Sequence, residues 1–128
     1  MPYDLKFSAG LLRYTLSGIV KLEDFLAAAR ETQAIEAEAP VSPNRITDLG
    51  AVEDFDMTFS KMVDFAAIRR AAQLKNNVRS AIVAPRQVQL GFARMFQTLN
   101  DNPQIEIRIF GDYQEALAWV EEPEPPGA

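Results

Sequence analysis

The sequence predicts an α/β domain with a mixed, mainly parallel sheet of about five strands and four flanking helices. Short apolar or alternating segments are interspersed with longer segments of helical periodicity, which is the pattern of βαβ crossovers. Only the first two strands follow one another directly, so they are expected to form an antiparallel hairpin. The predicted order of elements is β-β-α-β-α-β-α-β-α.

The spacing of apolar residues predicts two strands and a helix at the start of the chain. Apolar and polar residues alternate over Tyr3–Phe7 and again over Leu12–Leu16, with a tight turn at Ser8–Gly10 between them. Gly18 is expected to end the second strand. Helical spacing over Leu22–Ala37 then predicts the first helix, which two prolines prevent from continuing.

The middle of the chain predicts a short third strand, Arg45–Leu49, followed by an acidic loop, Gly50–Met57. A second helix is expected over about Phe59–Lys75. The adjacent cations Arg69 and Arg70 are expected on its solvated face. The apolar residues of this helix are read as one stripe, with three more that widen it: Phe59, Val63, Ala66, Ala67 and Leu74, then Met62, Phe65 and Ile68.

The last third predicts four more elements. Val78–Ala84 is almost continuously apolar and suits a central strand, and a helix is expected over Arg86–Asn100. Ile105–Ile109 alternates as a strand, and Asp112 opens a final helix with an approximate capping box. The domain is expected to span residues 1–121, and the acidic, proline-rich residues 122–128 are expected to be a disordered tail.

Composition excludes several classes of function. The 128 residues include no cysteine and no histidine, which excludes disulfides, Ser-His or Cys-His nucleophiles and the commonest transition-metal ligands. The net charge is −5 and the cations are scattered, so nucleic-acid binding is not expected. Neither a signal peptide nor a membrane span is recognised, and a cytoplasmic protein is expected. No cofactor and no enzymatic activity are predicted, because no pair of acid–base residues has a telling spacing.

Four stretches carry a resemblance to a known family: LEDFLAAARET, RITDLGAVEDFD, RSAIVAPRQVQLGFARMFQ and IEIRIFGDYQEALAWV. They cover most of the chain and resemble the STAS domains typified by anti-sigma-factor antagonists. The resemblance is closer to the small bacterial SpoIIAA-like, or STAS/CRAL-TRIO-like, proteins. It implies a STAS-like fold and regulation through protein–protein contacts.

In antagonist STAS domains, an Asp-Ser-Ser-Gly-like turn carries the phosphorylated serine at the start of the second helix. The corresponding stretch here runs from Asp56 to Ser60 and lacks the tandem serines and the glycine. Thr58 is the nearest hydroxyl and Ser60 is offset, and these two are the candidate phospho-acceptors. The alternative is that Asp56 or Thr58 only caps the helix.

Two further groups of charged residues are candidates for binding. Glu53, Asp54 and Asp56 could contact a partner, and together with Asp48 they could hold a magnesium ion, although a solvated acidic loop is the favoured reading. In parallel sheets, ligands usually meet the loops at the carboxyl ends of the strands. Arg86 follows a proline at such a junction and could contact an anion there, or it is an ordinary surface arginine.

The second and third helices hold more apolar residues than one buried stripe requires. The surplus could be core, a dimer interface or an apolar ligand cleft, and its members are Phe65, Ile68, Phe92, Met95 and Phe96. The leading hypothesis is a non-enzymatic STAS-like module that binds another regulatory protein and forms a homodimer. The alternative is a carrier or sensor of a small apolar or lipid-like ligand.

Overall fold

The computed structural model describes residues 3–123 and contains a five-stranded sheet with neighbours in the order β1-β2-β3-β4-β5. The strands are β1 (Tyr3–Ser8), β2 (Leu11–Lys21), β3 (Asn44–Asp56), β4 (Val78–Val83) and β5 (Ile105–Phe110). The helices are α1 (Leu22–Glu38), α2 (Phe59–Arg70), α3 (Gln87–Leu99) and α4 (Tyr113–Glu121). The predicted fold class and order of elements are confirmed. The tail expected at residues 122–128 lies, from residue 124 on, outside the described residues.

The opening hairpin forms as predicted. β1 pairs antiparallel with β2, and Ser8 pairs with Leu11, so Ala9 and Gly10 are the whole loop. Their φ angles are +52° and +75°. Two successive residues in the left-handed region are typical of the tight turns that match the twist of a hairpin.

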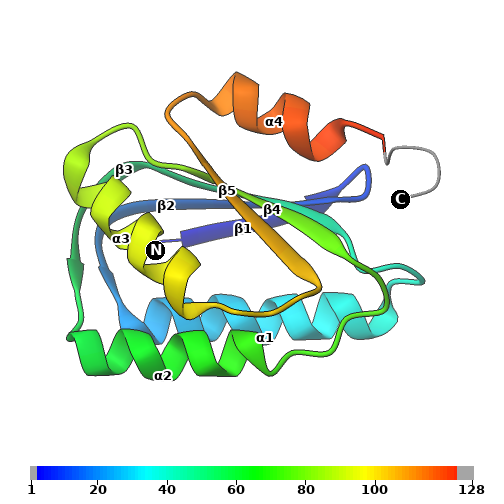
Figure 1. Cartoon of the computed structure of the whole chain (residues 1–128), viewed down its shortest axis with the longest axis horizontal. Coiled ribbons are helices and arrows are strands. Elements are labelled where there is room, and N and C mark those ends of the chain that lie inside the picture. The colour runs from blue at the N-terminus through cyan, green and yellow to red at the C-terminus, as the bar shows by residue number, and fades with distance from the viewer. Residues whose placement is uncertain (1–2, 124–128) are drawn as a thin grey trace.

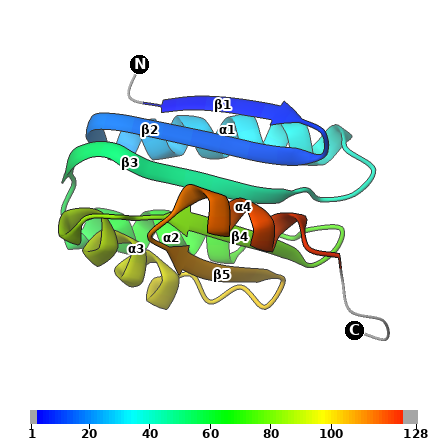
Figure 2. The ribbon, with the colours of Figure 1, turned by 90° about the horizontal axis from the view of Figure 1, so that it is seen from above.

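Helices cover both faces of the sheet, with three on one face and one on the other. β2 to β5 are parallel, and each crossover moves one strand further in the same direction. Right-handed crossovers therefore place α1, α2 and α3 on the same face. α4 follows the last strand and covers the opposite face, as Figure 1 and Figure 2 show. The protein consequently has two hydrophobic cores, one on each side of the sheet.

β2 and β3 are longer than predicted, and the expectation of an acidic loop at Gly50–Met57 is wrong. β3 continues to Asp56 and pairs with the second half of β2, where Lys21 lies opposite Asp56. Gly18 does not end β2, because it lies inside the strand at φ +65° beside a shift of register. A glycine with positive φ allows this bulge, so the ribbon bends and continues.

α2 is shorter than predicted and faces a different way. It ends at Arg70, because the Asn102 side chain donates to the carbonyls of Arg69 and Ala72 and thereby holds the chain in a turn. The stripe predicted around Phe59 and Val63 is wrong, since both are exposed. The face that packs on the core carries Met62, Phe65, Ala66 and, at the same helical spacing, Arg69.

Candidate functional site

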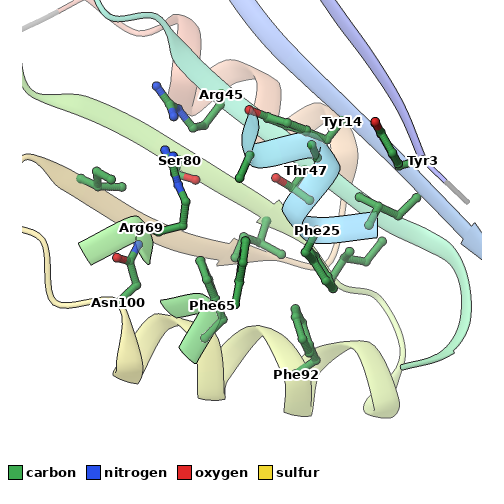
Figure 3. A pocket seen from close by; sticks show the side chains of 17 residues that line it. Tyr3, Tyr14, Phe25, Arg45, Thr47, Phe65, Arg69, Ser80, Phe92 and Asn100 are labelled. Carbon is green, nitrogen blue, oxygen red and sulfur yellow. The ribbon is translucent and has the colours of Figure 1, made fainter. Parts of the chain in front are cut away.

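A cavity of about 110 Å³ lies between the sheet and the layer formed by α1, α2 and α3. Its floor is made by inward-facing residues of β2, β3 and β4, and its roof by side chains of the helices (Figure 3). Aromatic rings gather on one side of it, while the polar side chains gather on the other. The cavity therefore has an apolar part and a polar part.

Phenylalanine rings build the apolar part. Phe25 of α1 lies 5.2 Å from Phe65 and 5.3 Å from Phe92, measured between ring centroids. Phe96 lies 5.8 Å from Phe65 and extends the cluster along α3. Such packing supplies a rigid apolar wall contributed by every helix of this layer.

The polar part lies at the amino-terminal ends of the parallel strands, where α1, α2 and α3 end. Arg45 and Ser80 come from the beginnings of β3 and β4, while Arg69 and Asn100 come from the ends of α2 and α3. The expectation of a site at the carboxyl ends of the strands does not hold for this cavity. The carboxy-terminal ends of helices carry partial negative charge, which makes this end of the layer more tolerant of buried cations.

Arg45 is a buried arginine with an anionic partner. Its Nη2 donates to Glu36 Oε2 at 2.8 Å and to the Pro43 carbonyl at 2.8 Å. Both side chains of this ion pair are largely buried, with 6% and 11% of their surface exposed. The Nε of Arg45 has no hydrogen-bond partner among the described residues.

Arg69 is buried without such a partner. Only 7% of the residue is exposed, and its buried Nη1 has no hydrogen-bond partner among residues 3–123. Burial lowers the pKa of its guanidinium, and the nearby charge of Arg45 lowers that pKa further. The prediction that Arg69 lies on a solvated face is therefore wrong. Its spacing of seven residues from Met62, on the packed face, is the sequence signal that could have revealed it.

Neutral polar groups complete this part of the cavity. The hydroxyl groups of Tyr14 and Thr32 are hydrogen-bonded to each other, and burial raises the pKa of Tyr14. The Oδ1 of Asn100 is buried and has no partner among the described residues. With two arginines and one carboxylate, the polar part carries an excess of positive charge in an apolar setting. It can hold an anion, but it offers no nucleophile with an adjacent base.

The candidate phospho-acceptors and the acidic residues near them lie elsewhere, at the junction of β3 and α2. Glu53, Asp54 and Asp56 are exposed at the end of β3. Thr58 is the N-cap of α2, and its Oγ1 accepts a hydrogen bond from the Lys61 backbone N–H at 3.2 Å. Thr58 therefore caps the helix, as the alternative expected, and its role as a phospho-acceptor stays a prediction. Ser60 is exposed in the first turn.

Arg86 lies at the start of α3, but its guanidinium is already engaged. Nη2 donates to the carbonyls of Val52 at 2.8 Å and Gly50 at 3.3 Å. The Gln89 side chain donates to the same two carbonyls. β4 pairs with β3 only up to Asp48, so these side chains take the place of the missing strand. This arrangement disfavours the anion contact that was considered for Arg86 as an alternative to an ordinary surface arginine.

The five surplus apolar residues divide into two groups. Phe65, Phe92 and Phe96 line the cavity. Ile68 and Met95 are exposed on the outside of the helix layer, with 44% and 38% of their surface accessible. Of the alternatives, the position of the first group suits core packing or a ligand cleft, and the position of the second group suits an interface with another chain.

Among the described residues, no three Asp, Glu, His or Cys side chains form a group that could hold a metal ion. Asp48, one of the acids considered for magnesium, instead accepts a hydrogen bond from the Gly50 N–H at 2.8 Å. No helix within residues 3–123 is both long and apolar enough to cross a membrane.

Comparison with solved structures identifies the architecture. A protein of the DUF3478 family from Shewanella loihica PV-4, described as having a SpoIIAA-like fold, aligns with a TM-score of 0.59 and 17% identity over 92% of this chain and 91% of its own. The fold is SpoIIAA-like, as the resemblance implied. An anti-sigma factor antagonist from Mycobacterium paratuberculosis aligns with a TM-score of 0.59 and 16% identity, covering 94% of this chain and 93% of its own. No protein-family model matches the sequence, and no curated protein matches it significantly.

Proposed function

We propose that this protein is a non-enzymatic, STAS-like regulatory module of the cytoplasm that binds another protein through the junction of β3 and α2. One observation carries the proposal: Phe59 is 61% exposed, beside the exposed carboxylates of Glu53, Asp54 and Asp56. An exposed aromatic ring with charges at its rim is the usual composition of a binding hot spot. The anti-sigma factor antagonist that shares the fold supports a protein partner.

The charge of the junction defines the partner. Three carboxylates lie within four residues of one another along β3, so the complementary surface would be basic around an apolar pocket for Phe59. Phosphorylation of Thr58 or Ser60 would add about two negative charges to this surface and, against a basic partner, would strengthen binding. A homodimer is part of the proposal and would use the exposed apolar residues Ile68 and Met95 on the outside of the helix layer.

The decisive experiment is affinity capture from the native host with quantitative mass spectrometry. Wild-type protein is compared with Phe59→Asp and with the control Val41→Asp. Val41 is equally exposed, at 63%, but lies between α1 and β3 at the other end of the sheet. We expect Phe59→Asp to lose a partner that Val41→Asp retains. Equal capture by both variants would contradict the proposed surface, and native mass spectrometry reports the homodimer separately.

The cavity favours a second candidate function, a carrier or sensor of a small ligand. An apolar space with a few convergent polar groups is the usual form of a ligand site. Native mass spectrometry of protein purified from its host, without added ligand, tests this candidate through a stoichiometric small-molecule adduct.

A further inference from the structure

We propose that the cavity beneath α1, α2 and α3 binds a small organic monocarboxylate, with the carboxylate on Arg69 and the apolar body among the phenylalanine rings. This inference names the ligand class for the second candidate function and rests on it. It is independent of the protein-binding surface at the junction of β3 and α2.

The unpartnered arginine is the first argument. A buried N–H of a charged group that lacks an acceptor costs free energy, and proteins satisfy nearly all such groups. Arg69 Nη1 is an exception, in a residue that is only 7% exposed and lines the cavity. An anion in the cavity would supply the missing acceptor, and a carboxylate matches the planar fork of a guanidinium.

The charge of the surroundings fixes the charge of the ligand. Arg45 is neutralised by Glu36 at 2.8 Å, so Arg69 is the one cation in the cavity lining without a carboxylate partner among the described residues. One negative charge completes the balance, whereas a doubly charged phosphate monoester would exceed it. Asn100, whose Oδ1 is also buried and unpartnered, adds a polar amide that can rotate to offer its nitrogen to the second carboxylate oxygen.

The size of the cavity fixes the body of the ligand. An engineered apolar cavity of about 150 Å³ in another protein binds benzene. The cavity here is about 110 Å³ and continues from Arg69 toward Phe25, Phe65 and Phe92 (Figure 3). This smaller volume limits the apolar body to at most a single aromatic ring or a chain of a few carbons, and it is too small for a long acyl chain.

Isothermal titration calorimetry with the full chain tests the proposal, with benzoate as the probe. Benzamide serves as the neutral counterpart of the same shape, and inorganic phosphate as an anion without an apolar body. We expect saturable one-to-one binding of benzoate that is at least tenfold tighter than that of either control. A tenfold difference is the minimum expected from one charge-assisted hydrogen bond.

Variants locate the site. Arg69→Met should weaken benzoate binding at least tenfold, while Arg69→Lys, which keeps the charge but loses the fork, should weaken it less. Arg94→Met removes an exposed arginine of α3 and should bind like the wild type. Thermal unfolding of each variant, monitored by circular dichroism, shows whether the folded state persists, so a loss of binding can be separated from misfolding.

The outcomes distinguish this inference from the function on which it rests. If benzamide binds as tightly as benzoate, or if Arg69→Met binds benzoate like the wild type, the carboxylate assignment is overturned while a ligand-binding function survives. If phosphate binds as tightly as benzoate, the cavity is only an anion site and the proposal fails. If no probe binds and the host protein carries no adduct, both the proposal and the second candidate function fail.

Discussion

Arginine side chains pack against a hydrophobic core on both faces of the sheet. The two faces differ in the partners that surround Arg79 and Arg108 on one side and Arg69 on the other. On the α4 face, Arg79 and Arg108 flank Trp119, with their guanidinium carbons 5.5 and 4.7 Å from the ring centroid. Arg79 also donates to the carbonyls of Trp119 and Glu122, at 2.8 and 3.1 Å. Its charge is met by an aromatic face and by the carboxy-terminal end of α4.

On the opposite face, Arg69 is buried more deeply and has fewer groups that accept its hydrogen bonds or balance its charge. Its Nη1 finds no acceptor among the described residues, and the nearest charges are another arginine and the carboxylate that this arginine already uses. The comparison separates an arginine whose charge is met by neighbouring groups from one whose charge is not. Removing a partner from the first destabilises the fold, whereas a buried cation without an acceptor costs free energy in the folded state.

The largest expected effect is on the α4 face, where Arg79 and Arg108 pack on Trp119. Trp119 is 7% exposed and joins α4 to the sheet, so Trp119→Ala should lower the free energy of unfolding by about 4 kcal/mol. Urea denaturation measures this change. Leu117→Ala, at a half-buried position of the same helix, should cost clearly less, and equal costs would show that Trp119 does not anchor α4.

The next effect removes the carboxylate of Glu36, which neutralises Arg45 in the cavity lining. Glu36→Gln leaves Arg45 and Arg69 buried together and should cost about 3 kcal/mol of stability. Glu38→Gln is the matched control, since it changes an exposed glutamate of the same helix and should stay within about 0.5 kcal/mol of the wild type. Similar unfolding midpoints for the two variants would contradict the role given to Glu36.

A smaller effect of opposite sign is expected at Arg69. Arg69→Met replaces a buried, unpartnered cation by an apolar side chain of similar length and should raise the free energy of unfolding by about 2 kcal/mol. Arg94→Met should leave it unchanged within about 0.5 kcal/mol. A destabilised Arg69→Met protein would mean that Arg69 has a stabilising partner, and it would remove the contrast between the two faces.

The smallest effect concerns the start of α2, outside both cores. Thr58→Ala removes the acceptor for the Lys61 N–H and should cost about 1 kcal/mol. Ser60→Ala should be nearly neutral, because Ser60 is exposed in the first turn and the N-cap of α2 is Thr58. Chemical denaturation of both variants checks the pair, and equal losses would show that the cap is not at Thr58.

Local rules were enough to predict much of this fold from the sequence. Alternating and helical periods placed all nine elements in the right order, and the turn at Ala9 and Gly10 and the cap at Asp112 were recognised from residue type. These features depend on neighbours within a few residues, such as the Asp112 side chain that accepts from the Glu115 N–H at 3.3 Å. Sequence periodicity therefore determined the fold class and the succession of its elements.

Contacts between distant segments decided the rest. β3 continues past Leu49 because β2 extends beside it and because Arg86 and Gln89, more than thirty residues away, satisfy its free carbonyls. α2 stops at Arg70 because Asn102 takes over its last carbonyls. The cavity also depends on contacts between distant segments. The local sequence around Arg69 is compatible with exposure or with burial, and the packing of three helices on one face of the sheet buries it.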